Sequence, residues 1–148
     1  MAAAVLSNRT ADWNSPKIIV DSSGTGPWHV GHKAHATSQK VWEAAGYQHS
    51  HVARQFQPSD FFTTDLILVM DSSNFNNVID LAIDDDSRKK VFYLRSFDPS
   101  LALINPTSAR FSELEVPDPY NQSLEAYEEV LIMIELAVDG LLQEIMRQ

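Results

Sequence analysis

The feature that most constrains the fold is a short apolar run at residues 65–70 (DLILVM), which ends at the polar residues 71–74 (DSSN). A continuous apolar run of this length predicts a strand buried on both faces, as in a parallel sheet. Residues 17–21 (KIIVD) and 90–94 (KVFYL) have the same character and are also predicted to be strands. Because stretches with helical spacing separate these strands, the sequence predicts an α/β domain with helices on both faces of the sheet.

Four stretches are predicted to be helices, namely 1–10, 35–45, 73–83 and 124–146. Gly46 ends the second helix, and side-chain oxygens of residues 71–74 cap the start of the third. The last helix keeps one apolar stripe, with glutamates on the opposite face. Residues 97–122 contain four prolines and are predicted to form an ordered loop.

The start of the chain departs from this alternation of strands and helices. Helix 1–10 has no Ser, Thr, Asp or Asn before it, so its first N–H groups are left uncapped. It also follows no strand. A parallel sheet entered from a helix lacks its first strand, so either the architecture is unusual, or the start codon is wrongly assigned and the protein begins further upstream.

The composition excludes several classes of function. The 148 residues carry a formal charge of −9 with no basic stripe, which argues against nucleic-acid binding. No apolar run approaches the ~20 residues that span a bilayer, and the N-terminus lacks the features of a secretory signal, so we expect a cytoplasmic protein with no membrane partner. The absence of cysteine removes disulfides, thiolate nucleophiles and Cys-ligated metals.

Asp118 is the most constrained candidate for chemistry. Pro117 and Pro119 restrict the backbone on either side of it, so its carboxyl group is held with little freedom. A carboxyl group held in this way is typical of an Asx turn before a helix, here one capped by Ser123. It also suits a general acid or base on a rigid loop.

Asp71 and His51 each allow a structural and a functional interpretation. Asp71 ends a predicted buried strand, where open α/β sheets place their ligands, but an aspartate there also caps the next helix. His51 is either a hydrogen-bonded core histidine or a catalytic one. The triplets His29/His32/His35 and 84–86 (DDD) suggest metal ligands, but Gly31 and the solvated character of the acidic run argue against convergence, so we expect no metal and no cofactor.

Seven stretches, taken in order, resemble the low-molecular-weight protein-tyrosine-phosphatase family. They are MAAAV (1–5), VDSSGTGPWHVG (20–31), SHVARQF (50–56), DLILVMDSSN (65–74), LRSFDP (94–99), VPDPY (116–120) and LEAYEEV (124–130). The resemblance implies a three-layer α/β/α fold with a four-stranded parallel sheet. It also implies a first strand and loop with the motif Cys-x5-Arg, whose thiolate attacks phosphorus while an aspartate protonates the departing tyrosine oxygen.

The resemblance assigns roles residue by residue. Asp118 matches the general acid. Trp28 and Tyr120 match aromatic walls that flank a phenyl ring. The side chains that match supports of the phosphate loop are Ser22, His51 and Asp71.

The chain also departs from the family pattern. The family motif ends in Ser-Pro-Met-Ala, whereas this chain begins at Met-Ala, so we expect residues 1–148 to be a single N-terminally truncated domain without the first strand. Such a chain lacks the nucleophilic Cys and the phosphate-binding Arg and is expected to be inactive as written. His35 and Thr37 stand where the family often has Asp and Arg, and Asn121 where it often has a second Tyr.

The expected substrate is a phosphotyrosine protein or a small aryl phosphate. Two alternatives stay open. One is a pseudophosphatase, or a module that binds phosphopeptides or a partner. The other is a relative that acts on phosphoarginine or arsenate. The sequence does not define the oligomeric state.

Overall fold

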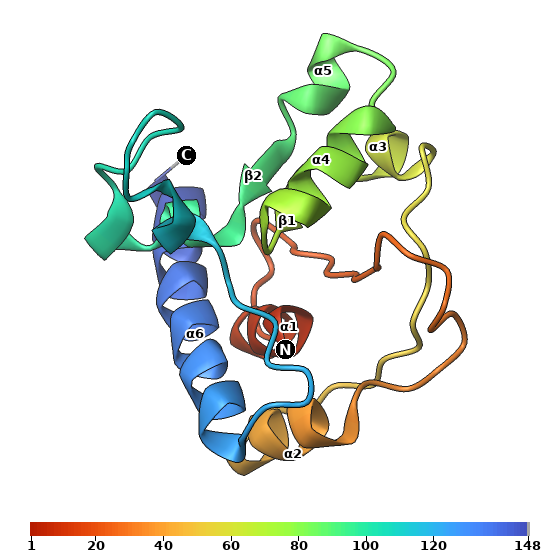
Figure 1. Ribbon diagram of the computed structural model, residues 1–148, viewed down its shortest axis with the longest axis vertical. Coiled ribbons are helices and arrows are strands. Elements are labelled where there is room, and N and C mark those ends of the chain that lie inside the picture. The colour runs from red at the N-terminus through yellow and green to blue at the C-terminus, as the bar shows by residue number, and fades with distance from the viewer. Residues whose placement is uncertain (148) are drawn as a thin grey trace.

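The computed structural model describes residues 1–147 and places a small parallel sheet between two groups of helices (Figure 1). The helices are α1 (Ala2–Arg9), α2 (Ala36–Ala44), α3 (Asp60–Thr63), α4 (Ser72–Asp80), α5 (Asp85–Arg88) and α6 (Leu124–Arg147). The strands are β1 (Ile67–Val69) and β2 (Val91–Tyr93), and the short 3-10 helices are η1 (Leu94–Phe97), η2 (Pro99–Leu101) and η3 (Phe111–Leu114).

β1 is buried from both sides, as its apolar run predicted. It pairs in parallel with β2, with Ile67 opposite Val91. Successive side chains of a strand point to opposite faces. Accordingly, Ile67 and Val69 belong to one hydrophobic cluster, while Leu68 and Met70 pack against another.

Each cluster forms under a different group of helices, which gives the α/β/α layering. The larger cluster joins α1, α2 and α6 to one face of β1, with α6 supplying most of its buried residues. The smaller cluster joins α3 and α4 to the other face through Phe61 and Val78. In Figure 1, α6, α1 and α2 surround the lower half of the molecule, and α3, α4 and α5 lie together above them.

The prediction of a strand at residues 17–21 is wrong. This segment forms no strand, and the Ile19 side chain is 85% exposed. Within residues 1–147 the sheet contains only β1 and β2, so the segment has no neighbouring strand with which to pair its N–H and C=O groups. Its β-branched residues favour an extended backbone but cannot form a strand without such a partner.

The cap at Asp71 and the stop at Gly46 are confirmed, but the helix predicted at 73–83 is shorter and ends at Asp80. Asp71 caps α4 by accepting a hydrogen bond from the Asn74 N–H at 2.7 Å. Gly46 follows α2 with a φ of +89°, in the left-handed region that favours glycine. No side chain caps the start of α1, as expected. Within the described residues, no helix has the length and hydropathy needed to cross a membrane.

The packing of α6 against η1 can be tested at Gly140, where the two elements approach closely. A Cβ atom at Gly140 would lie 1.8 Å from the Phe97 carbonyl oxygen, which is backbone and cannot rotate away. We therefore expect Gly140→Ala to lower the free energy of unfolding by about 1–3 kcal/mol, although alanine is the better helix former. Urea denaturation measures this. Gln143→Ala, at an exposed position of the same helix, should change it by less than about 0.5 kcal/mol. A Gly140→Ala chain as stable as the wild type would contradict the close approach.

Candidate active site

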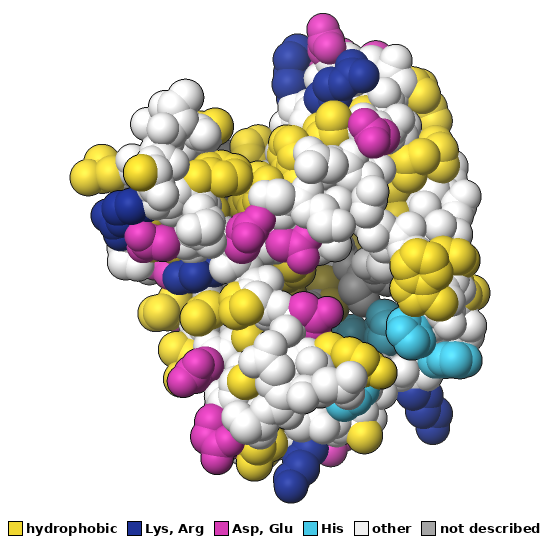
Figure 2. Space-filling model, in the orientation of Figure 1, with side chains coloured by type: hydrophobic (Ala, Val, Ile, Leu, Met, Phe, Trp, Pro, Cys, Tyr) yellow, Lys and Arg dark blue, Asp and Glu magenta, His cyan; other side chains and the backbone are white. Residues whose placement is uncertain are grey.

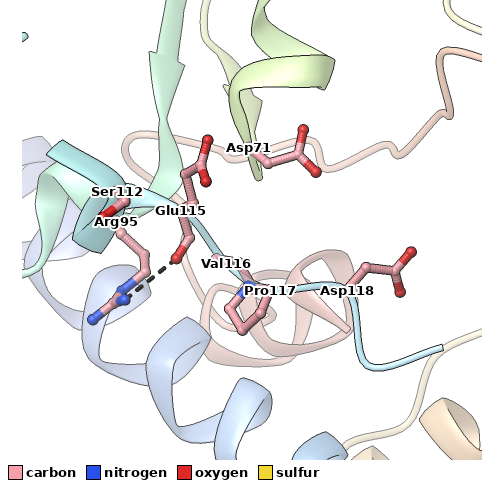
Figure 3. A pocket seen from close by; sticks show the side chains of 7 residues that line it. All are labelled: Asp71, Arg95, Ser112, Glu115, Val116, Pro117 and Asp118. Carbon is pink, nitrogen blue, oxygen red and sulfur yellow. Dashed lines mark hydrogen bonds between the residues drawn. The ribbon is translucent and has the colours of Figure 1, made fainter. Parts of the chain in front are cut away.

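A pocket of about 430 Å³ lies at the carboxyl edge of the sheet. Its lining residues are Asp71, Arg95, Ser112, Glu115, Val116, Pro117 and Asp118 (Figure 3). Asp71 follows β1 and Arg95 follows β2, so the pocket occupies the edge where open α/β sheets bind their ligands. The structure thus brings Asp71 and Asp118 to one pocket, and in Figure 3 their carboxylates extend toward the same side.

Asp118 is held by a tight turn of its own loop. Its Oδ1 accepts a hydrogen bond from the Tyr120 N–H at 3.0 Å, and the Gln122 side-chain amide donates to its carbonyl oxygen at 3.2 Å. Asn121 in this turn has a φ of +59°, a conformation that Asn adopts more readily than most residues. The Asx turn is therefore present, and it engages one carboxylate oxygen of an exposed side chain. The two interpretations of Asp118 are compatible, because the second oxygen has no hydrogen-bond partner among the described residues.

The segment before Asp118 is bonded to the turn between β1 and α4. The Val116 N–H donates to the Met70 carbonyl at 2.7 Å. Glu115 Oε1 accepts from the Ser72 N–H at 2.8 Å and also from the Ser72 hydroxyl. These bonds place the loop of Asp118 beside the start of α4. Sequence reasoning missed Glu115, and no motif of the chain drew attention to it.

Arg95 joins the same loop to the end of the sheet. Its Nη1 donates to the Glu115 carbonyl at 3.3 Å, the bond drawn in Figure 3, and its Nη2 lies 3.8 Å from Asp98 Oδ2. Asp98 is only 2% exposed and caps η2 through the Ser100 N–H at 2.9 Å. Arg95 of the LRSFDP stretch therefore lines the pocket, a role that the sequence alone did not reveal.

Ser22 and His51 do not line this pocket, but they contact each other. The Ser22 Oγ lies 3.1 Å from His51 Nδ1, so the structure pairs two of the predicted supporting side chains. The His49 ring stacks on His51 with centroids 6.4 Å apart, and its Nδ1 lies 3.4 Å from the Ser7 Oγ of α1. Burial lowers the pKa of both histidines, and the positive charge of the Met1 ammonium group lowers it further.

The loop that contains Trp28 is attached to residues 51–56 by backbone hydrogen bonds at both of its ends. At one end, the Gly24 N–H donates to the Arg54 carbonyl at 2.9 Å. At the other, the Gly31 N–H donates to the Ala53 carbonyl at 2.8 Å. The backbone of residues 51–56 therefore holds both ends of this loop, although the two segments do not form a regular sheet.

Arg54 was not predicted as a site residue, although it lies in the SHVARQF stretch. Its guanidinium donates to Asp21 through Nε at 2.9 Å and to Asp60 through Nη1 at 2.8 Å. Partial burial opposes ionisation of Asp21, but the bonds from Arg54 and from the Ser22 N–H outweigh it and lower the pKa of this carboxyl group. Arg54 thereby fixes the residue next to Ser22, and with it the Ser22–His51 pair.

The two predicted aromatic walls are both exposed. Trp28 is 76% exposed, and its indole covers Gly26, where an added Cβ would lie 2.3 Å from the indole Cζ2. Tyr120 is 56% exposed and meets the His35 ring edge-on at 5.5 Å. The two walls belong to separate loops. Within residues 1–147, the Trp28 indole makes no ring contact with Tyr120 or His35.

The histidines and the acidic triplet 84–86 do not converge on a common site within the described residues. Figure 2 shows several histidines gathered on one side of the visible face, and the His29 and His32 rings lie 5.8 Å apart. Asp84 caps α5 by accepting from the Ser87 N–H at 2.7 Å. Over the described part of the chain, no three His, Asp or Glu side chains are close enough to hold a metal ion.

Comparison with known proteins gives a consistent result. The family model described as "Low molecular weight phosphotyrosine protein phosphatase" matches residues 1–148. The low molecular weight protein-tyrosine-phosphatase of Streptomyces coelicolor is 37% identical, over 100% of this chain and 86% of its own length. The protein-tyrosine phosphatase A of Mycobacterium tuberculosis is 35% identical, over 84% of this chain and 69% of its own. A crystal structure of an Entamoeba histolytica protein tyrosine phosphatase has a TM-score of 0.83 and 28% identity, covering 99% of this chain and 87% of that one.

The Met1 amine, His49 and His51 together predict that the stability of the 148-residue chain depends on pH. Burial of the Met1 amine lowers its pKa from 8.0 to about 6. Between these values the unfolded chain binds the proton more tightly, so stability is greatest above pH 8 and falls as the pH decreases to 6. The largest contribution of the amine is about 2.7 kcal/mol, and both histidines act in the same direction below their ordinary pKa.

Urea denaturation between pH 8.5 and 5.5 measures this dependence. Acetylation of the Met1 amine removes the group that titrates at higher pH, and it also removes the charge that lowers the pKa of both histidines. An acetylated chain should therefore keep only a decrease below the ordinary histidine pKa, and a smaller one than in the free chain. A stability that stays constant or increases as the pH is lowered from 8 to 6 would show that these groups are not desolvated.

Proposed function

We propose that Asp118 is the acid that protonates the departing tyrosine oxygen in phosphotyrosine hydrolysis. The premise is that the chain belongs to the low molecular weight phosphotyrosine protein phosphatase family. The observation that carries this proposal is the geometry of the turn at Asp118. The Tyr120 N–H and two flanking prolines hold the carboxyl group at the edge of the pocket with one oxygen unengaged.

The chemistry of an aryl phosphate explains why such an acid is needed. A tyrosine leaving group has a pKa of about 10 and departs slowly as the anion, so a proton donated in the transition state lowers the barrier. A positioned general acid contributes roughly 10²–10⁴-fold. The exposed rings of Trp28 and Tyr120 supply apolar faces for the phenyl group, which supports a phosphotyrosine protein or a small aryl phosphate as the substrate.

The same proposal limits what these residues can do alone. The family reaction passes through a phosphocysteine, and the 148 residues contain no cysteine. Asp118 can supply a proton but cannot form the covalent intermediate. In this proposal Ser22, His51 and Asp71 support a phosphate loop rather than hold the phosphate themselves.

We therefore expect the purified 148-residue chain to show no hydrolysis of p-nitrophenyl phosphate or phenyl phosphate above the buffer rate. The physical reason is the missing thiolate, and the measurement is phosphate release over several hours at high protein concentration. Asp118→Asn should leave this background unchanged. Turnover that exceeds the background and is lost in Asp118→Asn would overturn the expectation of inactivity.

The role of Asp118 is tested in a chimaera that carries the family's strand and Cys-x5-Arg loop ahead of Met1. In this chimaera, Asp118→Asn should lower kcat on phenyl phosphate by about 10²–10⁴-fold. The decrease should be smaller on p-nitrophenyl phosphate, whose leaving group needs little protonation. Asp80→Asn, at an exposed aspartate of α4, is the matched control and should change neither rate. Equal losses on both substrates would argue against an acid role for Asp118.

A further inference from the structure

His35 connects the start of α2 to the loop that carries Asp118. Its ring stacks on Tyr127 of α6, with centroids 5.7 Å apart and planes 13° apart. The same ring meets Tyr120 edge-on, at 5.5 Å and 74°. Tyr127 is 2% exposed and is part of the larger hydrophobic cluster, whereas Tyr120 is 56% exposed. One imidazole therefore lies between a tyrosine fixed in the core and a tyrosine at the surface.

Hydrogen bonds define the orientation of this ring. The His35 Nδ1 accepts from the Thr37 N–H at 3.3 Å, which caps α2. The Tyr127 hydroxyl lies 3.3 Å from the same nitrogen. Because Nδ1 accepts the Thr37 N–H, its lone pair is directed at the start of α2. The bond from the Thr37 N–H and the contact with the Tyr127 hydroxyl both restrict rotation of the ring and fix how it meets Tyr120.

Tyr120 in turn holds Asp118. Its N–H donates to Asp118 Oδ1 at 3.0 Å. The contacts run from the buried Tyr127 through His35 to the Tyr120 ring, and then through the Tyr120 backbone to the carboxylate. The bonds of Glu115 and Val116 hold the loop on the N-terminal side of Asp118.

We propose that His35 is a positioning residue that holds the Tyr120 ring and, through the Tyr120 N–H, the carboxylate of Asp118. This role is distinct from capping. Asp, Asn, Ser or Thr would cap α2 as well, but none of them offers a ring to Tyr120. The use of Tyr120 and Asp118 in catalysis rests on the proposed function, whereas the position of the Tyr120 ring does not.

Two substitutions separate the ring from the cap. His35→Asn keeps a strong capping acceptor and removes the ring, while His35→Phe keeps a flat ring and removes the acceptor. The readouts are the ring resonances of Tyr120 in the 148-residue chain labelled with ¹³C-tyrosine, and the hydrogen-exchange protection of the Tyr120 and Thr37 amides. Loss of the signal in Tyr120→Phe assigns the Tyr120 ring.

In His35→Asn we expect the Tyr120 ring resonances to move toward those of a free tyrosine and the Tyr120 amide to lose protection, while the Thr37 amide stays protected. In His35→Phe we expect the Tyr120 signals to stay near their wild-type positions, and the Thr37 amide to lose about fivefold in protection. Unchanged Tyr120 resonances in His35→Asn, or an equal displacement in His35→Phe, would overturn the proposal. Neither readout uses a substrate, so an Asp118→Asn chimaera with full activity would refute the proposed function and leave this result standing.

Discussion

The burial of β1 on both faces is the constraint on which the rest of the structure depends. Alternate side chains of this strand enter two different hydrophobic clusters, and these clusters collect the helices into layers on either side. Each buried aliphatic side chain contributes about 1.5–3 kcal/mol, so one short strand organises a large share of the core. The carboxyl end of β1 then positions Asp71 and, through the bond from the Val116 N–H to the Met70 carbonyl, the loop that carries Asp118.

The site is assembled mainly from loops, and hydrogen bonds hold these loops to the packed elements. Glu115 attaches the loop of Asp118 to the start of α4, while Arg54 attaches Asp21, the residue next to Ser22, to α3 through Asp60. Charge-assisted hydrogen bonds of this kind are stronger than neutral ones and restrict direction as well as distance. They allow exposed side chains such as Asp118 to keep a defined position without burial.

The local patterns predicted a large part of this arrangement. The apolar run of β1, the cap at Asp71 and the stop at Gly46 act over a few residues, and all three are confirmed. The strand predicted at 17–21 is wrong, because a strand requires a neighbour that its own residues cannot specify. Glu115 and Arg54 were missed for a related reason, since the partners of their hydrogen bonds are brought near only by the fold.

By itself, the sequence determined the alternation of apolar strands with capped helices, the absence of a thiol, and the family to which the chain belongs. These properties depend on residue type and on short-range spacing. The tertiary structure alone decided that Asp71 and Asp118 share a pocket, that Ser22 meets His51, and that His35 lies between Tyr120 and Tyr127. Such contacts join segments far apart in the chain, and they exist only after hydrophobic burial has closed the loops between them.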